Sequence, residues 1–219
     1  MATTDRPHQL SLDPATAAAA LSDLLALKDV RRQGWVDHGV PVAETESVAD
    51  HSWGMALLAV VLPLPPGVDR GRLLQLIALH DVAEVVVGDL TPATAPPGKL
   101  ELELSALSSL LQALSTAGVL GGADREQLHR QMGRALQRKA AVTTALRASV
   151  GGAVVELPPA DDAELWLARL DLLERLLQAW RYRRQGQGSQ LVDFAVGPSG
   201  LEGTALQPLG AWLQEQLRR

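Results

Sequence analysis

The 219-residue sequence has no cysteine, very few aromatic residues, no excess of positive charge and no apolar run of bilayer length. The lack of cysteine excludes a disulfide framework, a cysteine-based zinc site and a thiol nucleophile. A net charge of −5 provides no general basic surface, so we expect no nucleic-acid partner. The opening sequence MATTDRPHQLSLDP lacks the apolar core of a signal peptide, and we expect a cytoplasmic protein with no membrane partner.

Alanine and leucine dominate the sequence, and their spacing is helical rather than alternating. We therefore predict an all-α fold, a globular bundle of six to seven helices in a single domain spanning residues 1–219. The predicted helices cover 14–27, 47–62, 70–87, 99–117, 124–148, a segment from 161 or 162 to 184, and a short segment from 207. The long connection at 28–45 has no helical period, which is typical of a functional loop.

One predicted helix carries ionisable residues inside an apolar sequence. In QLIALHDVAEVV, His80, Asp81 and Glu84 lie among leucine, isoleucine and valine. Burying three such groups costs free energy unless they pair or bind a metal ion. On a continuous helix, residues three and four positions apart share a face, so we expect Glu84 beside both Asp81 and His80.

Two other apolar helices each contain a residue that can bind a metal. His51 lies in ESVADHSWGMALLAVVL, and Asp171 lies in ELWLARLDLLERLLQAW. The ordinary alternatives are a histidine packed in the core and an ion pair between Asp171 and Arg175, one turn later. Together with His80 and Asp81, these residues offer two nitrogen and two oxygen ligands, a set that suits Mn, Fe, Co, Ni or Zn. Adjacent residues point about 100° apart on an ideal helix, so His80 and Asp81 reach one ion only if it lies between them.

This pattern of a histidine, a His-Asp pair and a distant aspartate resembles the HD-domain metal-dependent phosphohydrolases. The segments ESVADHSWGMA (46–56), LHDVAEVVVGDLTP (79–92) and LARLDLLERLLQA (167–179) resemble the 5′-deoxynucleotidase branch, in its bacterial and eukaryotic forms. LKDVRRQGWVDHGV (27–40) is similar to the substrate loop of that branch. The core motifs fall within 21–92 and 163–182, residues 93–160 match loosely, and 186–219 form a C-terminal appendage.

The resemblance implies a homodimeric enzyme that hydrolyses (deoxy)nucleoside 5′-monophosphates to nucleoside and phosphate. It implies a divalent metal ion as cofactor (Mn, Co, Fe, Ni, Zn or Mg) and a small-molecule nucleotide as substrate. Glu84 matches the acid that acts on the attacking water, and Asp89 matches an acid near the leaving sugar oxygen. Arg32 matches a phosphate-binding arginine, a role that Arg31 could exchange with it. Trp35 matches a bulky residue that disfavours a 2′-hydroxyl, although a tryptophan in such a loop more often packs the loop onto the body.

Three other functions stay open at this point. Another HD phosphohydrolase could act on a ppGpp-like or cyclic nucleotide, although no GYP extension follows the His-Asp pair. A di-iron HD oxygenase needs further histidine ligands, and His8, His38 and His129 form no metal-binding pair in the sequence. A non-catalytic nucleotide-binding protein would need no water-activating acid, so Glu84 and Asp89 argue against it.

Overall fold

The computed structural model describes residues 12–91, 94–150, 159, 162–197 and 199–219. Across these residues the chain is all-α, as predicted, with nine α-helices and three short 3₁₀ helices. Its β structure in the same residues is limited to an isolated bridge between Arg31 and Ser47. The described part of the chain contains no helix of the length and apolarity that a membrane crossing requires.

The α-helices are α1 (Pro14–Leu25), α2 (Gln33–Asp37), α3 (Val48–Val61), α4 (Arg70–Leu79), α5 (Glu84–Val87), α6 (Lys99–Thr116), α7 (Gly122–Val150), α8 (Ala163–Arg184) and α9 (Gln207–Arg218). The 3₁₀ helices are η1 (Ala26–Lys28), η2 (Val42–Glu44) and η3 (Leu191–Ala195). The break between α7 and α8 lies mostly outside the described residues.

Local sequence signals account for where several helices begin. The side chains of Asp13, Asp69 and Asp162 each accept a hydrogen bond from a backbone N–H in the first turn of α1, α4 and α8. Ser47 and Asp50 form a reciprocal capping box at the start of α3. This box fixes the first turn of α3 and with it the position of His51.

The structure corrects the predicted helix at 70–87. Helix α4 ends at Leu79, a turn covers residues 80–83, and α5 begins at Glu84. The backbone N–H of Val82 donates to the Leu79 carbonyl, and that of Glu84 to the Asp81 carbonyl, which are the tighter bonds of a 3₁₀ turn. The expected loop at 28–45 likewise contains α2 and η2, which raises the helix count above the predicted six to seven.

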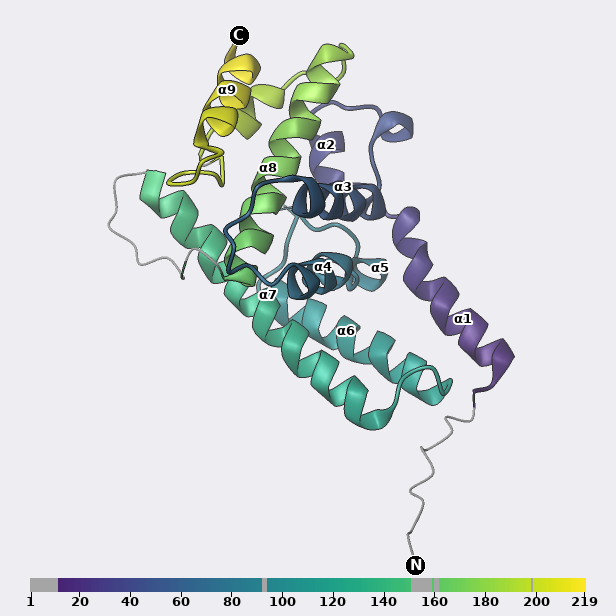
Figure 1. Ribbon diagram of the computed structural model, residues 1–219. Coiled ribbons are helices and arrows are strands. Elements are labelled where there is room, and N and C mark those ends of the chain that lie inside the picture. Colours follow the sequence, from purple (N-terminus) through teal and green to yellow (C-terminus); the bar gives the residue numbers. More distant parts are fainter. Residues whose placement is uncertain (1–11, 92–93, 151–158, 160–161, 198) are drawn as a thin grey trace, which may run out of the picture.

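Helix α8 forms the centre of the bundle and packs against α3, α4, α7 and α9 (Figure 1). Its apolar residues point in all directions, and Trp166, Leu167, Leu170 and Leu173 are almost fully buried. Helices α6 and α7 form a long hairpin on one side, and α1 packs along α6. The first turn of α3, the end of α4 and the middle of α8 meet in the interior of the bundle.

Candidate metal centre

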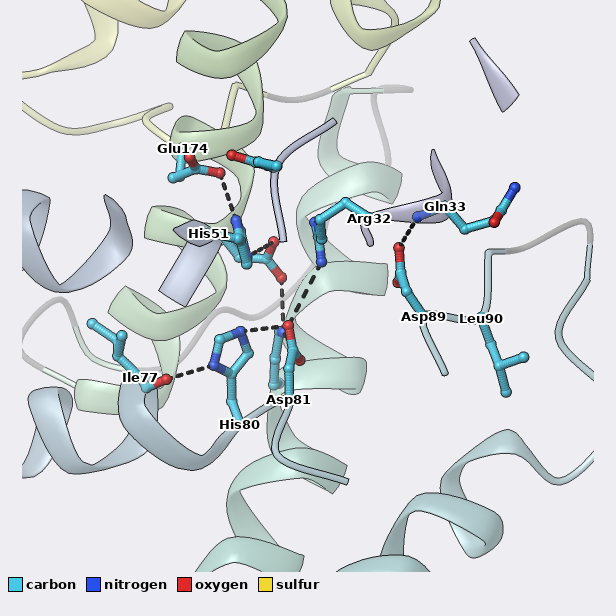
Figure 2. A network of polar contacts seen from close by, with 12 residues as sticks. Arg32, Gln33, His51, Ile77, His80, Asp81, Asp89, Leu90 and Glu174 are labelled. Atoms are coloured by element: carbon cyan, nitrogen blue, oxygen red, sulfur yellow. Dashed lines mark hydrogen bonds and ion pairs between the residues drawn. The ribbon is translucent and has the colours of Figure 1, made fainter. Parts of the chain in front are cut away.

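The predicted ligands come together at this meeting point (Figure 2). His51, His80 and Asp81 each place one ligand atom within 4.8 Å of the others. Asp171 joins them, since its Oδ1 lies 3.5 Å from Nε2 of His51. The turn after α4 turns both His80 and Asp81 toward this point, which an ideal helix would not do.

Each histidine is oriented by a hydrogen bond at Nδ1. His51 Nδ1 lies 2.5 Å from Glu174 Oε2, and His80 Nδ1 lies 2.8 Å from the Ile77 carbonyl oxygen. A neutral imidazole that donates from Nδ1 carries a lone pair on Nε2. Burial, followed by the positive charge of Arg32, lowers the pKa of His51 well below its usual value, which keeps that ring neutral.

The Nε2 atoms of the two histidines face carboxylate oxygens, so both atoms of each contact are hydrogen-bond acceptors. His80 Nε2 lies 2.9 Å from Asp81 Oδ2, in addition to the contact between His51 Nε2 and Asp171. Both Nε2 atoms are buried and have no hydrogen-bond partner among the described residues. Buried polar atoms rarely lack a partner, and two imidazole lone pairs directed at two carboxylates need a cation between them. The donor set therefore fits a divalent metal ion.

Lys139 on α7 also contacts the two aspartates, and sequence reasoning missed it. Its Nζ lies 2.8 Å from Asp171 Oδ2 and 3.7 Å from Asp81 Oδ1. The spacing of the buried Met132, Ala135 and Val142 places Lys139 on the apolar stripe of α7. A lysine on such a stripe is the sequence signal that could have identified it. Asp171 is thus paired with Lys139 and His51, whereas the guanidinium of the suspected partner Arg175 lies over the Phe194 ring.

Opposite charges decide the protonation of the two aspartates. Burial alone would raise the pKa of Asp171, but Lys139 and then His51 hold it below its usual range. For Asp81, His80 and then Lys139 likewise outweigh burial and lower its pKa. Both residues are therefore carboxylates at neutral pH.

Two acids beyond the ligand set lie next to it. Glu84 is buried, and burial followed by the nearby charges of Asp81 and Asp89 raises its pKa to about 9. Its Oε2 has no hydrogen-bond partner among the residues described. Asp89 follows Gly88 at the end of α5 and accepts a hydrogen bond of 2.6 Å from the backbone N–H of Gln33. That bond joins the loop after α5 to the first turn of α2.

Glu46 and Glu174 form a second acidic pair, on the Nδ1 side of the His51 ring. Glu46, His51 and Glu174 form a further group with ligand atoms within 4.8 Å of one another. Here the Trp35 indole N–H donates to Glu46 at 2.8 Å, while Glu174 bonds His51. Burial and then Glu46 raise the pKa of Glu174, whereas an imidazole N–H that donates to Oε2 favours the carboxylate form. We interpret this group as hydrogen-bonding support for His51, and sequence reasoning did not identify it.

An open cleft of about 630 Å³ adjoins the centre. Its lining residues are Arg32, Gly34, Trp35, Asp37, His38, Asp89, Leu90, Thr91, Arg175, Asp193, Phe194, Val196 and Gly197. Arg32 connects the cleft to the centre, because its NH1 lies 3.6 Å from Asp81 Oδ2. Arg31 is exposed and donates to the Thr45 carbonyl oxygen, so the structure places Arg32 and not Arg31 at the cleft.

Trp35 contributes more to packing than to the surface of the cleft. Only 2% of the residue is exposed, and its ring contacts Tyr182 at 5.3 Å and Phe194 at 4.4 Å between centroids. Phe194, on η3, is half-buried and also lies 4.5 Å from the His38 ring. No periodic pattern in the sequence points to Phe194, which is an isolated aromatic residue in a predicted loop.

The other histidines do not extend the metal centre. His38 lies in the cleft near Asp193, and His129 lies on α7 in a separate depression beside Arg125. His8 falls outside the described residues. Within the described chain, the groups that could hold a metal include only His51 and His80 among the histidines, which argues against a di-iron site.

Comparison with known proteins identifies the family. A model described as an HD domain matches residues 24–195, most of the chain. The chain belongs to the HD domain family. This assignment agrees with the all-α fold.

The HD-domain chain is also similar to curated proteins. It is 37% identical to 5′-deoxynucleotidase YGK1 of Saccharomyces cerevisiae over 92 residues, 42% of this chain and 39% of that protein. It is 35% identical to 5′-deoxynucleotidase hdd1 of Schizosaccharomyces pombe over 96 residues, 43% of this chain and 47% of that protein. The matches thus span less than half the length of these two relatives. With 5′-deoxynucleotidase HDDC2 of Danio rerio the identity is 27% over 80% of this chain and 74% of that protein.

Solved structures share the fold of this HD domain. The PH0347 protein of Pyrococcus horikoshii aligns with a TM-score of 0.59 at 20% identity, over 92% of this chain and 98% of that chain. A protein of Magnetospirillum magnetotacticum, described as a predicted metal-dependent phosphohydrolase, aligns with a TM-score of 0.58 at 20% identity, over 93% of both chains. At these identities the likeness establishes the fold alone.

Proposed function

We propose that this chain is a metal-dependent phosphomonoesterase that hydrolyses (deoxy)nucleoside 5′-monophosphates to nucleoside and phosphate. The observation that carries the proposal is the pair of buried Nε2 atoms, on His51 and His80, directed at the carboxylates of Asp171 and Asp81 beside an open cleft. Family membership and the names of the similar 5′-deoxynucleotidases support the same chemistry.

In this proposal His51, His80, Asp81 and Asp171 hold the ion. A bound divalent ion would neutralise phosphoryl oxygens and lower the pKa of a water molecule. The hydrogen bonds to Glu174 and to the Ile77 carbonyl hold the two rings with Nε2 facing inward. The protein thereby prepares the ligand set before the substrate arrives.

The acids and Arg32 would handle the proton and the phosphate. During hydrolysis a water oxygen bonds to phosphorus, the bond from phosphorus to the 5′-oxygen breaks, the water loses a proton and the departing oxygen gains one. Glu84, whose buried Oε2 has no hydrogen-bond partner among the described residues, would accept the proton that the water loses, because the charge of a bound divalent ion would favour its carboxylate form. Asp89 would hold or protonate the departing oxygen, and Arg32 would bind non-bridging oxygens with its planar donors.

The cleft fits the nucleoside part of the substrate. Phe194 offers a half-buried aromatic ring in a wall that continues from Arg32, and Trp35 supports that ring from behind. Stacking on an aromatic side chain tolerates any base, which agrees with a site that selects for the 5′-phosphate. The predicted role of Trp35 in excluding a 2′-hydroxyl stays a prediction.

A substrate panel tests the proposal. Inorganic phosphate release is measured with dAMP, AMP, sugar phosphates and general phosphoesters, with each of Mn²⁺, Co²⁺, Zn²⁺ and Mg²⁺ and with excess chelator. We expect turnover of 5′-monophosphates that the chelator abolishes and a divalent ion restores. Asp171→Asn should lose this turnover, while Asp124→Asn, at an exposed position of α7, should retain it. Turnover unaffected by chelator and by Asp171→Asn would contradict the assignment.

The homodimer stays a prediction of the same proposal. The family resemblance implies the dimer, and exposed apolar side chains of Val192, Val196 and Trp212 support it. Light scattering on the purified chain distinguishes a dimer from a monomer.

A further inference from the structure

The contacts of Lys139 differ from those of an ordinary surface ion pair. It comes from α7, within the region that resembles the family least, and its side chain is 16% exposed. Its ammonium contacts two aspartates that are far apart in the sequence, at 2.8 Å and 3.7 Å. Two carboxylates so close to each other repel unless a cation lies between them.

The two aspartates divide their oxygens in the same way. Asp171 directs Oδ1 at His51 and Oδ2 at Lys139. Asp81 directs Oδ2 at His80 and Oδ1 at Lys139. One oxygen of each carboxylate thus faces the imidazoles, and the other faces the ammonium. Lys139 therefore contacts the carboxylate oxygens that do not contact the imidazoles.

We propose that Lys139 is a built-in counter-cation of the metal centre, which neutralises the aspartate pair in the metal-free protein and weakens the binding of a divalent ion. The inference rests on the metal site of the proposed function. The ammonium lies one carboxylate group away from the oxygens that would bind the ion, so the two positive charges repel at short range. Lys139 would thus favour an exchangeable ion over a permanently held one.

The size of the effect follows from the charges. A single and a double charge about 6 Å apart, in surroundings of effective dielectric constant about 20, repel strongly enough to change an equilibrium by more than a factor of ten. Loss of the hydrogen bond to Asp171 would also loosen one ligand, which weakens metal binding. We expect the Coulombic effect to dominate, because Asp171 keeps its position on the buried helix α8.

Metal affinity of the purified full chain tests the inference without any activity measurement. Co²⁺ and Mn²⁺ affinities are measured by competition with a fluorescent chelator at fixed pH and ionic strength. Lys139→Met should bind at least about tenfold more tightly than wild type, while Lys139→Arg, which keeps the charge, should stay within about threefold. Arg134→Met removes one charge from an exposed position of the same helix and should change affinity less than about twofold.

Thermal unfolding gives a second readout. Without metal, Lys139→Met should melt below wild type, because two carboxylates lose their counter-ion, and added Co²⁺ should raise its melting temperature more than that of wild type. Unchanged or weaker metal binding by Lys139→Met overturns the inference and leaves Lys139 a structural residue. Tighter binding without phosphate release from any nucleotide would support the inference and count against the proposed function.

If Lys139→Met does not fold, an NMR experiment on the wild-type protein tests whether Lys139 lies next to the metal ion. The chain has three lysines, so ¹³C labelling at the lysine ε-carbon gives few signals, which Lys28→Arg and Lys99→Arg assign by difference. Addition of Zn²⁺ should shift the Lys139 signal most. An unchanged Lys139 signal at saturating Zn²⁺ would refute the proposal.

Discussion

Substitution of Glu174 is the sharpest test of how the protein prepares its metal site. The carboxylate contacts His51 Nδ1 at 2.5 Å, and both side chains are at least nine-tenths buried. A hydrogen bond that involves a charged group contributes about 1.5–3 kcal/mol. Loss of the carboxylate behind a metal-binding histidine typically reduces metal affinity about 10–100-fold, which corresponds to about 1.4–2.8 kcal/mol.

Two variants separate the charge from the hydrogen bond. Glu174→Gln keeps an oxygen that accepts the Nδ1–H but loses the negative charge, so we expect an affinity loss of about tenfold. Glu174→Leu removes both and leaves Nδ1 buried without a partner, so we expect a loss nearer a hundredfold. Glu164→Gln is the matched control, because Glu164 lies on the same helix and pairs with Arg72 at 3.1 Å, away from His51.

Calorimetric titration with Mn²⁺ or Co²⁺ measures these affinities, and circular dichroism confirms that each variant is folded. Wild-type affinity in both Glu174 variants would refute the view that this residue orients His51. A loss of equal size in Glu164→Gln would show that any charge removed from α8 has the same effect. The expected change is opposite in sign to that of Lys139→Met, so the two substitutions check each other.

Three further substitutions test the roles of individual side chains. Glu84→Gln should retain its metal but lower kcat at least about a hundredfold, and near-normal kcat would exclude a role in proton transfer. Phe194→Ala should lower kcat/KM for dAMP by about 5–150-fold, as expected for the loss of about 1–3 kcal/mol of base stacking, and leave deoxyribose 5-phosphate unaffected. An equal loss on both substrates would argue against base stacking. Trp35→Ala should lower the free energy of unfolding in urea by about 3–5 kcal/mol because the ring is buried, and an unchanged ratio of dAMP to AMP turnover would show that Trp35 does not select the sugar.

Helix positions were predictable because their signals are local. Asp13, Ser47 and Asp69 precede apolar helical sequences, and each caps the helix that follows it. The position of His51 follows directly from the capping box at Ser47, because the box fixes the first turn of α3. Such information lies within three or four residues and needs no knowledge of the rest of the fold.

The break after Leu79 was not predictable in the same way. The apolar spacing from Leu73 to Val86 fits one continuous helix, and no proline or glycine interrupts it. The turn is accompanied by the hydrogen bond between His80 Nδ1 and the Ile77 carbonyl. Asp81 also contacts Arg32 and Lys139 from distant segments, so the departure from the local helical preference coincides with tertiary contacts at the candidate site.

Lys139 and Phe194 show a different limit. The apolar stripe of α7 marks Lys139 as an inward-facing lysine, but it does not indicate which residues its ammonium contacts. Phe194 lies in a short 3₁₀ helix whose contacts with Trp35 and His38 join segments more than 150 residues apart. No pattern within a single segment could have placed Lys139 beside the two aspartates or Phe194 at the cleft.

The charges at the site explain how an acidic chain could bind a phosphate dianion. The carboxylates of Asp81, Asp171 and Asp89 face the cations Arg32 and Lys139, while Glu84, with a pKa near 9, stays neutral. The metal-free site therefore has no excess of positive charge that would attract a nucleotide phosphate. A divalent ion would add two positive charges at this point, so the metal should bind first. Nucleotide affinity measured in chelator should accordingly be lost, and appreciable dAMP binding without metal would contradict this electrostatic order.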